Sequence, residues 1–125
     1  MANRAFNLLA SLVSLAAVPA VAHHAFSREF DESKTVVLRG VVTRIDWQNP
    51  HVFFYVDVKD GDGRAVNWAC ETRGPRGLAR GGWTRDSLKP GDKVIVQGFL
   101  ARDGSHKADG RKVTLADGRK ILSSD

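Results

Sequence analysis

Three histidines have the residue type and the setting for metal chemistry: His23, His24 and His51. The first two directly follow an apolar N-terminal run that has the pattern of a cleaved leader. If cleavage falls after Ala22, His23 carries a free α-amine beside its own imidazole, and these groups titrate near ~7.7–8.0 and ~6.5. Both can lose a proton to a metal at neutral pH, and nitrogen ligands in a tetragonal plane suit Cu(II) or Ni(II). One hypothesis is therefore a copper site made by the mature terminus and His51.

Other interpretations of these histidines stay open. Cleavage after Ala20 would put His23 third from a free amine, which is also a square-planar chelator of copper or nickel. The terminal histidines can equally be polar residues that suit export, and His51 can be a structural histidine bonded to a turn. Glu71 is a candidate fourth ligand if the end of its strand lies near His51. His106 falls in a polar stretch and is expected to be solvated.

A second candidate site is the irregular stretch 74–88, which contains five glycines or prolines and is made basic by arginines within it and by Arg73 just before it. Its composition excludes a long helix and allows about one helical turn, with Thr84 as a candidate cap of the segment 84–88. Trp83 is expected to cover one mouth of the fold, and the alternative is a platform on which a ligand stacks. The residues that could bind an anionic ligand are Arg73, Arg76, Arg80 and Trp83; a solvated basic loop is the plainer interpretation.

The first 22 residues predict a secretory signal peptide. Arg4 gives a positive start, residues 8–18 form a short apolar core, and residues 20–22 have the small-x-small pattern of a cleavage site. This run is too short to span a bilayer, which takes about 20 apolar residues, and no second apolar run follows it. We expect export, to the periplasm in a Gram-negative source, of a single domain over residues 23–125.

The charge balance favours anionic partners. The whole chain carries +5, and loss of Arg4 leaves the mature chain at +4. Such a charge attracts an acidic protein or an anionic component of the cell envelope, while export argues against nucleic acid as the physiological ligand. No enzymatic constellation is evident: Ser27 lies near the terminal histidines only by sequence, and the glycine clusters lack the lysine of a phosphate-binding loop. A binding or accessory domain is therefore preferred, and the copper protein is the alternative.

Alternation of apolar and polar residues predicts an all-β fold. Five strands are expected, at residues 35–47, 51–58, 64–71, 93–102 and 111–122. Gly40 interrupts the first strand and predicts a bulge or bend, and Asp117-Gly118 predicts a small terminal hairpin. Five strands with an insert after the third match a small OB-like Greek-key barrel, whose closure removes exposed edges. An open β-sandwich is the alternative architecture.

The single cysteine, Cys70, cannot form an intramolecular disulfide. It shares an apolar face with Val66 and Trp68, so we expect it to be buried and inert, as a small hydrophobic residue. A reactive or intermolecular thiol is the alternative. Trp68 is expected in the core, and Trp47 is expected to pack at one end of the barrel.

Four blocks of this sequence together resemble a family of small exported bacterial proteins known as a domain of unknown function, DUF6152. They are HHAFSREFD (23–31), VLRGVVTRIDWQNPHV (37–52), WACE (68–71) and GGWTRDSLKPGDKVIVQGFLARDG (81–104). Their order and spacing carry the resemblance, which covers essentially the whole mature chain. It implies a periplasmic OB-like domain and implies no activity.

Overall fold

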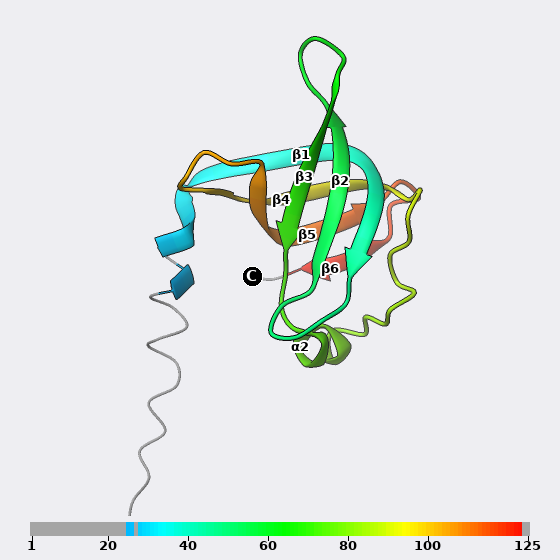
Figure 1. The fold of residues 1–125 in the computed structure, drawn as a ribbon. Coiled ribbons are helices and arrows are strands. Elements are labelled where there is room, and N and C mark those ends of the chain that lie inside the picture. The colour runs from blue at the N-terminus through cyan, green and yellow to red at the C-terminus, as the bar shows by residue number, and fades with distance from the viewer. Residues whose placement is uncertain (1–24, 27, 124–125) are drawn as a thin grey trace, which may run out of the picture.

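The computed structural model describes residues 25–26 and 28–123, and these residues form a mostly β structure. The predicted signal peptide, His23 and His24 lie outside the described residues. Helical residues 25–26 and 28–29 are followed along the described chain by six strands and the short helix α2 (Figure 1). They are β1 (Phe30–Asp46), β2 (Phe53–Lys59), β3 (Ala65–Glu71), α2 (Pro75–Arg80), β4 (Lys93–Ala101), β5 (Lys107–Leu115) and β6 (Lys120–Ser123).

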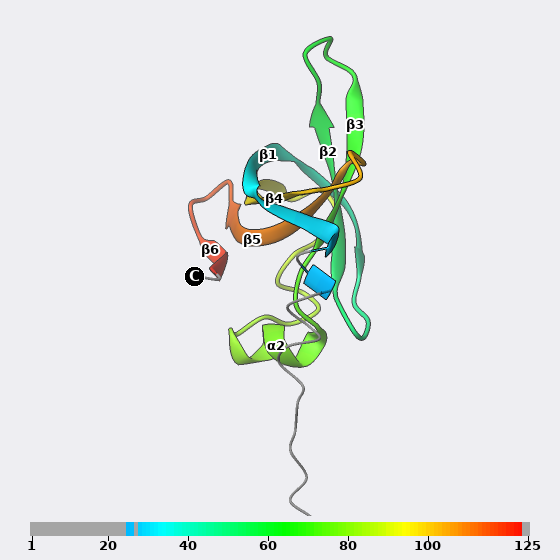
Figure 2. The same ribbon diagram turned by 90° about the vertical axis from the view of Figure 1, so that its left-hand side faces the viewer.

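The strands form one sheet that closes on itself. Its order is β3-β2-β1-β4-β5-β6, and an additional parallel pairing of β3 with β5 completes a ring of five strands. The other pairings are antiparallel. The β2–β3 hairpin projects beyond the ring at one end, and α2 lies at the opposite end (Figures 1 and 2). The predicted β fold with a short helical insert between the third and fourth strands is thus confirmed.

Gly40 lies where β1 bends and changes partners. It is opposite Val94 of β4 and also opposite Val58 of β2. A Cβ atom at this position would lie 2.1 Å from the backbone oxygen of Asp57, so the close approach of the strands requires glycine. β1 curves strongly in Figure 1, and a register shift lies between Val42 and Arg44, a few residues after this glycine.

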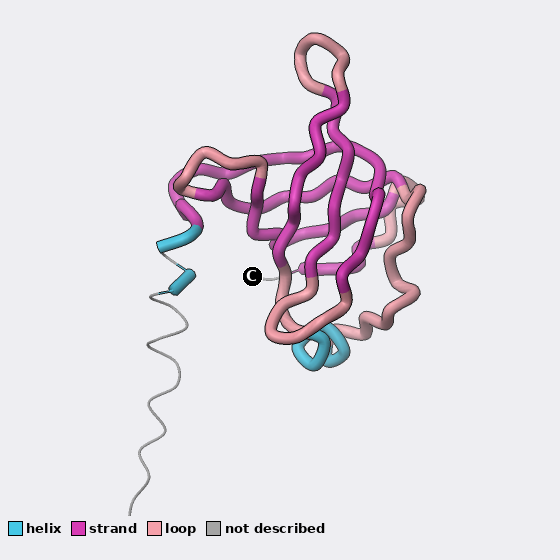
Figure 3. Tube along the Cα trace, in the orientation of Figure 1, coloured by secondary structure: helices cyan, strands magenta, loops and turns pink. Residues whose placement is uncertain are grey.

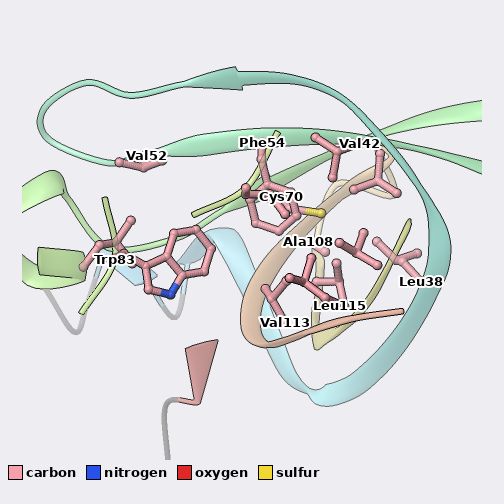
Figure 4. Packing of buried hydrophobic residues seen from close by; sticks show 14 residues of the cluster. Leu38, Val42, Val52, Phe54, Cys70, Trp83, Ala108, Val113 and Leu115 are labelled. Atoms are coloured by element: carbon pink, nitrogen blue, oxygen red, sulfur yellow. The ribbon is translucent and has the colours of Figure 1, made fainter. Parts of the chain in front are cut away.

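The core fills the inside of the ring with the apolar face of each strand. Val52, Phe54 and Val56 are fully buried, as their alternation predicts. Cys70 is buried against them, and burial raises the pKa of its thiol to about 12. The prediction of a buried, inert cysteine agrees with this position. Trp83 lies at one end of the cluster, away from Leu38 (Figure 4).

Three sequence predictions about elements were wrong in detail. The predicted strands 93–102 and 111–122 leave residues 103–110 between them, but β5 already begins at Lys107, and its alternate residues Ala108 and Gly110 are buried. The strands number six rather than five, because the predicted terminal hairpin is present and its second arm is β6. The helical turn begins at Pro75 rather than near Thr84 (Figure 3), because proline is suited to a first helical position and Leu78 anchors the turn in the core.

Among the described residues, no helix has the length and apolar composition needed to cross a membrane.

Candidate functional site

His51 and Glu71 are brought into contact by the ends of two paired strands. His51 lies two residues before the start of β2 at Phe53, and Glu71 is the last residue of β3, opposite Phe53. Beyond them, Thr72 N–H donates to the Val52 carbonyl at 2.9 Å, which keeps the two segments together. The Nδ1 atom of His51 forms a hydrogen bond with Oε1 of Glu71. The proximity that the sequence hypothesis required of these two side chains is therefore present.

Lys107 lies on the other side of the Glu71 carboxylate. Its Nζ is 2.7 Å from Oε2 of Glu71 and also contacts Glu29. Burial disfavours the charged ammonium, but the contacts with the carboxylates of Glu29 and Glu71 outweigh it and raise the pKa of Lys107. The buried Oε2 makes an ion pair without the geometry of a hydrogen bond. Both oxygens of Glu71 are thus engaged, one by a histidine and one by a lysine.

This arrangement fixes which nitrogen of His51 is available. A carboxylate accepts a hydrogen bond, so Nδ1 carries the proton of the neutral imidazole and Nε2 keeps its lone pair. The His51 side chain is 50% exposed and lines a cavity. Histidines that bind metals commonly donate their other N–H to a carboxylate in this way. In this arrangement Glu71 orients His51 and does not itself face the free nitrogen.

A cavity of about 300 Å³ lies beside this pair. His51 and Glu71 line it together with Ala25, Phe26 and Arg111. Phe26 is held there by two contacts. The centroid of its ring lies 5.4 Å from the centroid of the Phe30 ring and 4.9 Å from Cζ of the Arg111 guanidinium. Ala25, which directly follows His24 in the sequence, is thereby attached to the wall that carries His51.

No group of three or more histidine, cysteine or acidic side chains among residues 25–26 and 28–123 is arranged to hold a metal ion. His51 is brought to the cavity and His106 is not one of its lining residues. His106 instead lies beside Trp68, with ring centroids 5.0 Å apart. A metal site at His51 would therefore need further ligands from His23 or His24.

The candidate anion-binding residues are separated by the fold. Arg73 is exposed at the rim of the cavity, whereas Arg76 and Arg80 lie on α2 and do not line it. Trp83 is only 4% exposed, and its Nε1–H donates to the Ile121 carbonyl. A ligand has no access to the ring face of Trp83 here, and its burial fits the lid interpretation.

Sequence reasoning missed Asp109 and Arg111, which also line the cavity. Arg111 Nε donates to Oδ2 of Asp109. Burial raises the pKa of Asp109, and the hydrogen bond from Arg111 opposes that shift. The signal that could have found them is alternation: Lys107, Asp109 and Arg111 are every second residue, and they continue the predicted strand 111–122 toward the N-terminus.

A family model described as a family of unknown function, DUF6152, matches residues 10–111. This range includes His51, Glu71 and Lys107 as well as the N-terminal histidines. No curated protein matches the chain.

Proposed function

We propose that this chain, which belongs to the DUF6152 family of unknown function, is an exported protein that binds copper through His51 and its mature N-terminus. The observation that carries the proposal is the hydrogen bond between His51 Nδ1 and Glu71, which leaves the lone pair of Nε2 for a ligand. The half-exposed His51 side chain supports access of a ligand to the ring. The function is binding; no catalytic step is proposed.

The covalent chain supplies the second support. Ala25 lines the same cavity as His51. Two residues of chain span at most about 7 Å, so His23 cannot lie farther than that from Ala25, measured between Cα atoms. Cleavage after Ala22 would give His23 a free amine and an imidazole, and three nitrogen ligands with His51 suit Cu(II). Cleavage after Ala20 would leave His23 in a terminal chelating motif.

The test is a competition titration of Cu(II) against the untagged mature protein, whose first residue is identified by mass spectrometry. A synthetic peptide of residues 23–31 serves as the control, because it has the same terminal histidines and lacks His51. One-to-one binding at least tenfold tighter than the peptide, about 1.4 kcal/mol, supports a built site. Equal affinity for the protein and the peptide would leave only a chelating tail and overturn the proposal.

A second candidate is an accessory domain that binds an anionic ligand at the same cavity. It is favoured by Arg73, whose exposed guanidinium stands at the rim without an ion pair among the described residues. Amide chemical shifts on titration with inorganic phosphate test it. Saturable shifts at Thr72 and Gly110 that disappear in Arg73→Ala, but persist in Arg76→Ala, are expected. Chemical-shift changes that persist in both variants would contradict this candidate.

We also propose that the ring is an OB-like Greek-key barrel. Its five strands, the helix between β3 and β4 and the parallel contact of β3 with β5 support this architecture. An exported location is proposed on the leader pattern of residues 1–22.

A further inference from the structure

Part of β1 has a free edge. Residues 35–39 pair with β4 on one side, whereas the pairing of β1 with β2 begins only at Gly40. Among the described residues, no strand or backbone hydrogen bond covers the other side of this segment. Figure 1 shows this half of β1 along the upper rim of the ring, above β4. Unpaired N–H and C=O groups on such an edge are a template for another extended chain.

A groove of about 470 Å³ begins at this edge and crosses the outer face of the sheet. Val37, Phe99 and Lys112 are among its lining residues. Val37 is 53% exposed and Val41 is 38% exposed, and these are the exposed large hydrophobic residues of the described chain. The groove therefore offers an apolar contact directly beside unpaired backbone.

The same face is basic. Residues that are directly opposite each other in a sheet share a face. Val37 is opposite Gln97, which is opposite Lys112, so Lys112 lies on the same face as Val37. Lys93 is opposite Val41 and lies on that face as well. Arg39 is two residues from Val37 and projects to the same side. No described residue forms an ion pair with these three cations.

Carboxylates are scarce around this groove. The acidic residues nearest in register are Asp109, opposite Phe99, and Asp57, opposite Val41. Asp109 is already bonded to Arg111, and Asp57 accepts a hydrogen bond from Asn67. The charge of the face is thus not neutralised by the protein itself. It complements a negatively charged partner, and the attraction is expected to weaken with salt.

We propose that the free edge of β1 and its groove dock an extended acidic peptide segment of a partner protein. The segment adds a strand to residues 35–39, places an apolar side chain against Val37 and Phe99, and directs carboxylates to Arg39 and Lys112. Strand addition draws affinity from main-chain hydrogen bonds, which a lipid surface does not supply to a strand edge. This surface is independent of the copper site and would stand if copper binding failed.

The test uses the whole mature protein and an end-blocked peptide of alternating glutamate and valine. Amide chemical shifts and hydrogen exchange are followed at residues 35–39. A lysine–valine peptide of equal length is the charge control, and vesicles of phosphatidylglycerol are the membrane control. Saturable binding of the acidic peptide at about 1 mM or below, with slower exchange along this edge, is expected. Binding of the lysine peptide as tightly, or of the vesicles alone, would overturn the proposal.

A pair of double variants sharpens the test. Arg39→Gln with Lys112→Gln should weaken the acidic peptide at least tenfold, since both cations that face it are lost. Arg85→Gln with Lys89→Gln removes the same amount of charge from exposed loop positions outside the groove and should leave the affinity within twofold. If the two double variants weaken peptide binding equally, the effect comes from the net charge of the protein, and the assignment of the groove is overturned.

Discussion

Glu71 accepts a hydrogen bond from Nδ1 of His51, across the paired ends of β3 and β2. The second oxygen of the same carboxylate lies 2.7 Å from the Lys107 ammonium. The histidine is thus oriented by a group that is itself fixed in a largely buried position. This relationship gives His51 a defined free nitrogen and gives the cavity its chemistry.

The first prediction concerns the tautomer of His51. At neutral pH the neutral ring should carry its proton on Nδ1, because Glu71 accepts that bond. Nitrogen chemical shifts of the imidazole report the tautomer directly. Glu71→Ala should release this preference, whereas Glu32→Ala, a change at an exposed residue of β1, should not. A proton on Nε2 in the unaltered protein would be incompatible with this hydrogen bond.

The second prediction concerns the stability supplied by Lys107. Its replacement in Lys107→Met leaves the carboxylate of Glu71 buried without its cation, and the Glu71 side chain is only 9% exposed. We expect the free energy of unfolding to fall by about 2–3 kcal/mol. Urea denaturation at neutral pH measures this loss.

A matched lysine and a double variant control that measurement. Lys112→Met alters an exposed lysine of the same strand and should change stability by no more than about 0.5 kcal/mol. Lys107→Met combined with Glu71→Gln should recover part of the loss, since the buried charge is removed with its partner. Strictly additive losses in the double variant would show that the two side chains are not coupled.

The third prediction is a pH dependence that depends on Cys70. Burial raises the pKa of this thiol to about 12 in the folded protein, against 9.0 as the ordinary value. The stability that comes from the protonated thiol is complete below 9.0 and is lost as the pH rises toward the folded pKa. Between about pH 8 and about pH 10.5, the unaltered protein should lose about 2 kcal/mol more than Cys70→Ala does. Parallel curves for the two proteins in urea denaturation would refute this.

The fourth prediction concerns Gly40. A methyl group in Gly40→Ala meets the Asp57 carbonyl oxygen at 2.1 Å, so the strands must separate locally. We expect a loss of about 2 kcal/mol or more in thermal or urea unfolding. Gly61→Ala has nothing within 4 Å of the new atom and is the matched control. Equal free energies of unfolding for the two variants would show that the close approach at Gly40 does not affect stability.

The β fold could be predicted from local alternation, because residues such as Val52, Phe54 and Val56 report burial by their spacing alone. The bend at Gly40 was likewise readable. The parallel pairing of β3 with β5 was not, because it joins segments distant in sequence and leaves no local pattern.

That missing pairing explains what was missed at the site. The sequence proposed His51 and Glu71 as neighbours, and their contact follows from the end of the β2–β3 pairing. Lys107 and Asp109 reach the site only through the pairing of β5 with β3, so a polar loop was the natural interpretation of their residue types. Trp83 was hard to place for a related reason, since its burial depends on a tertiary contact with Ile121.

The most direct test of the copper proposal compares two single histidine variants. Cu(II) is titrated against the mature protein, His51→Ala and His106→Ala, with a competing chelator to fix the affinity. His51→Ala should weaken binding at least tenfold, about 1.4 kcal/mol, and His106→Ala should leave it unchanged. Identical affinities for all three proteins would contradict a site at His51 and leave copper to the terminal histidines alone.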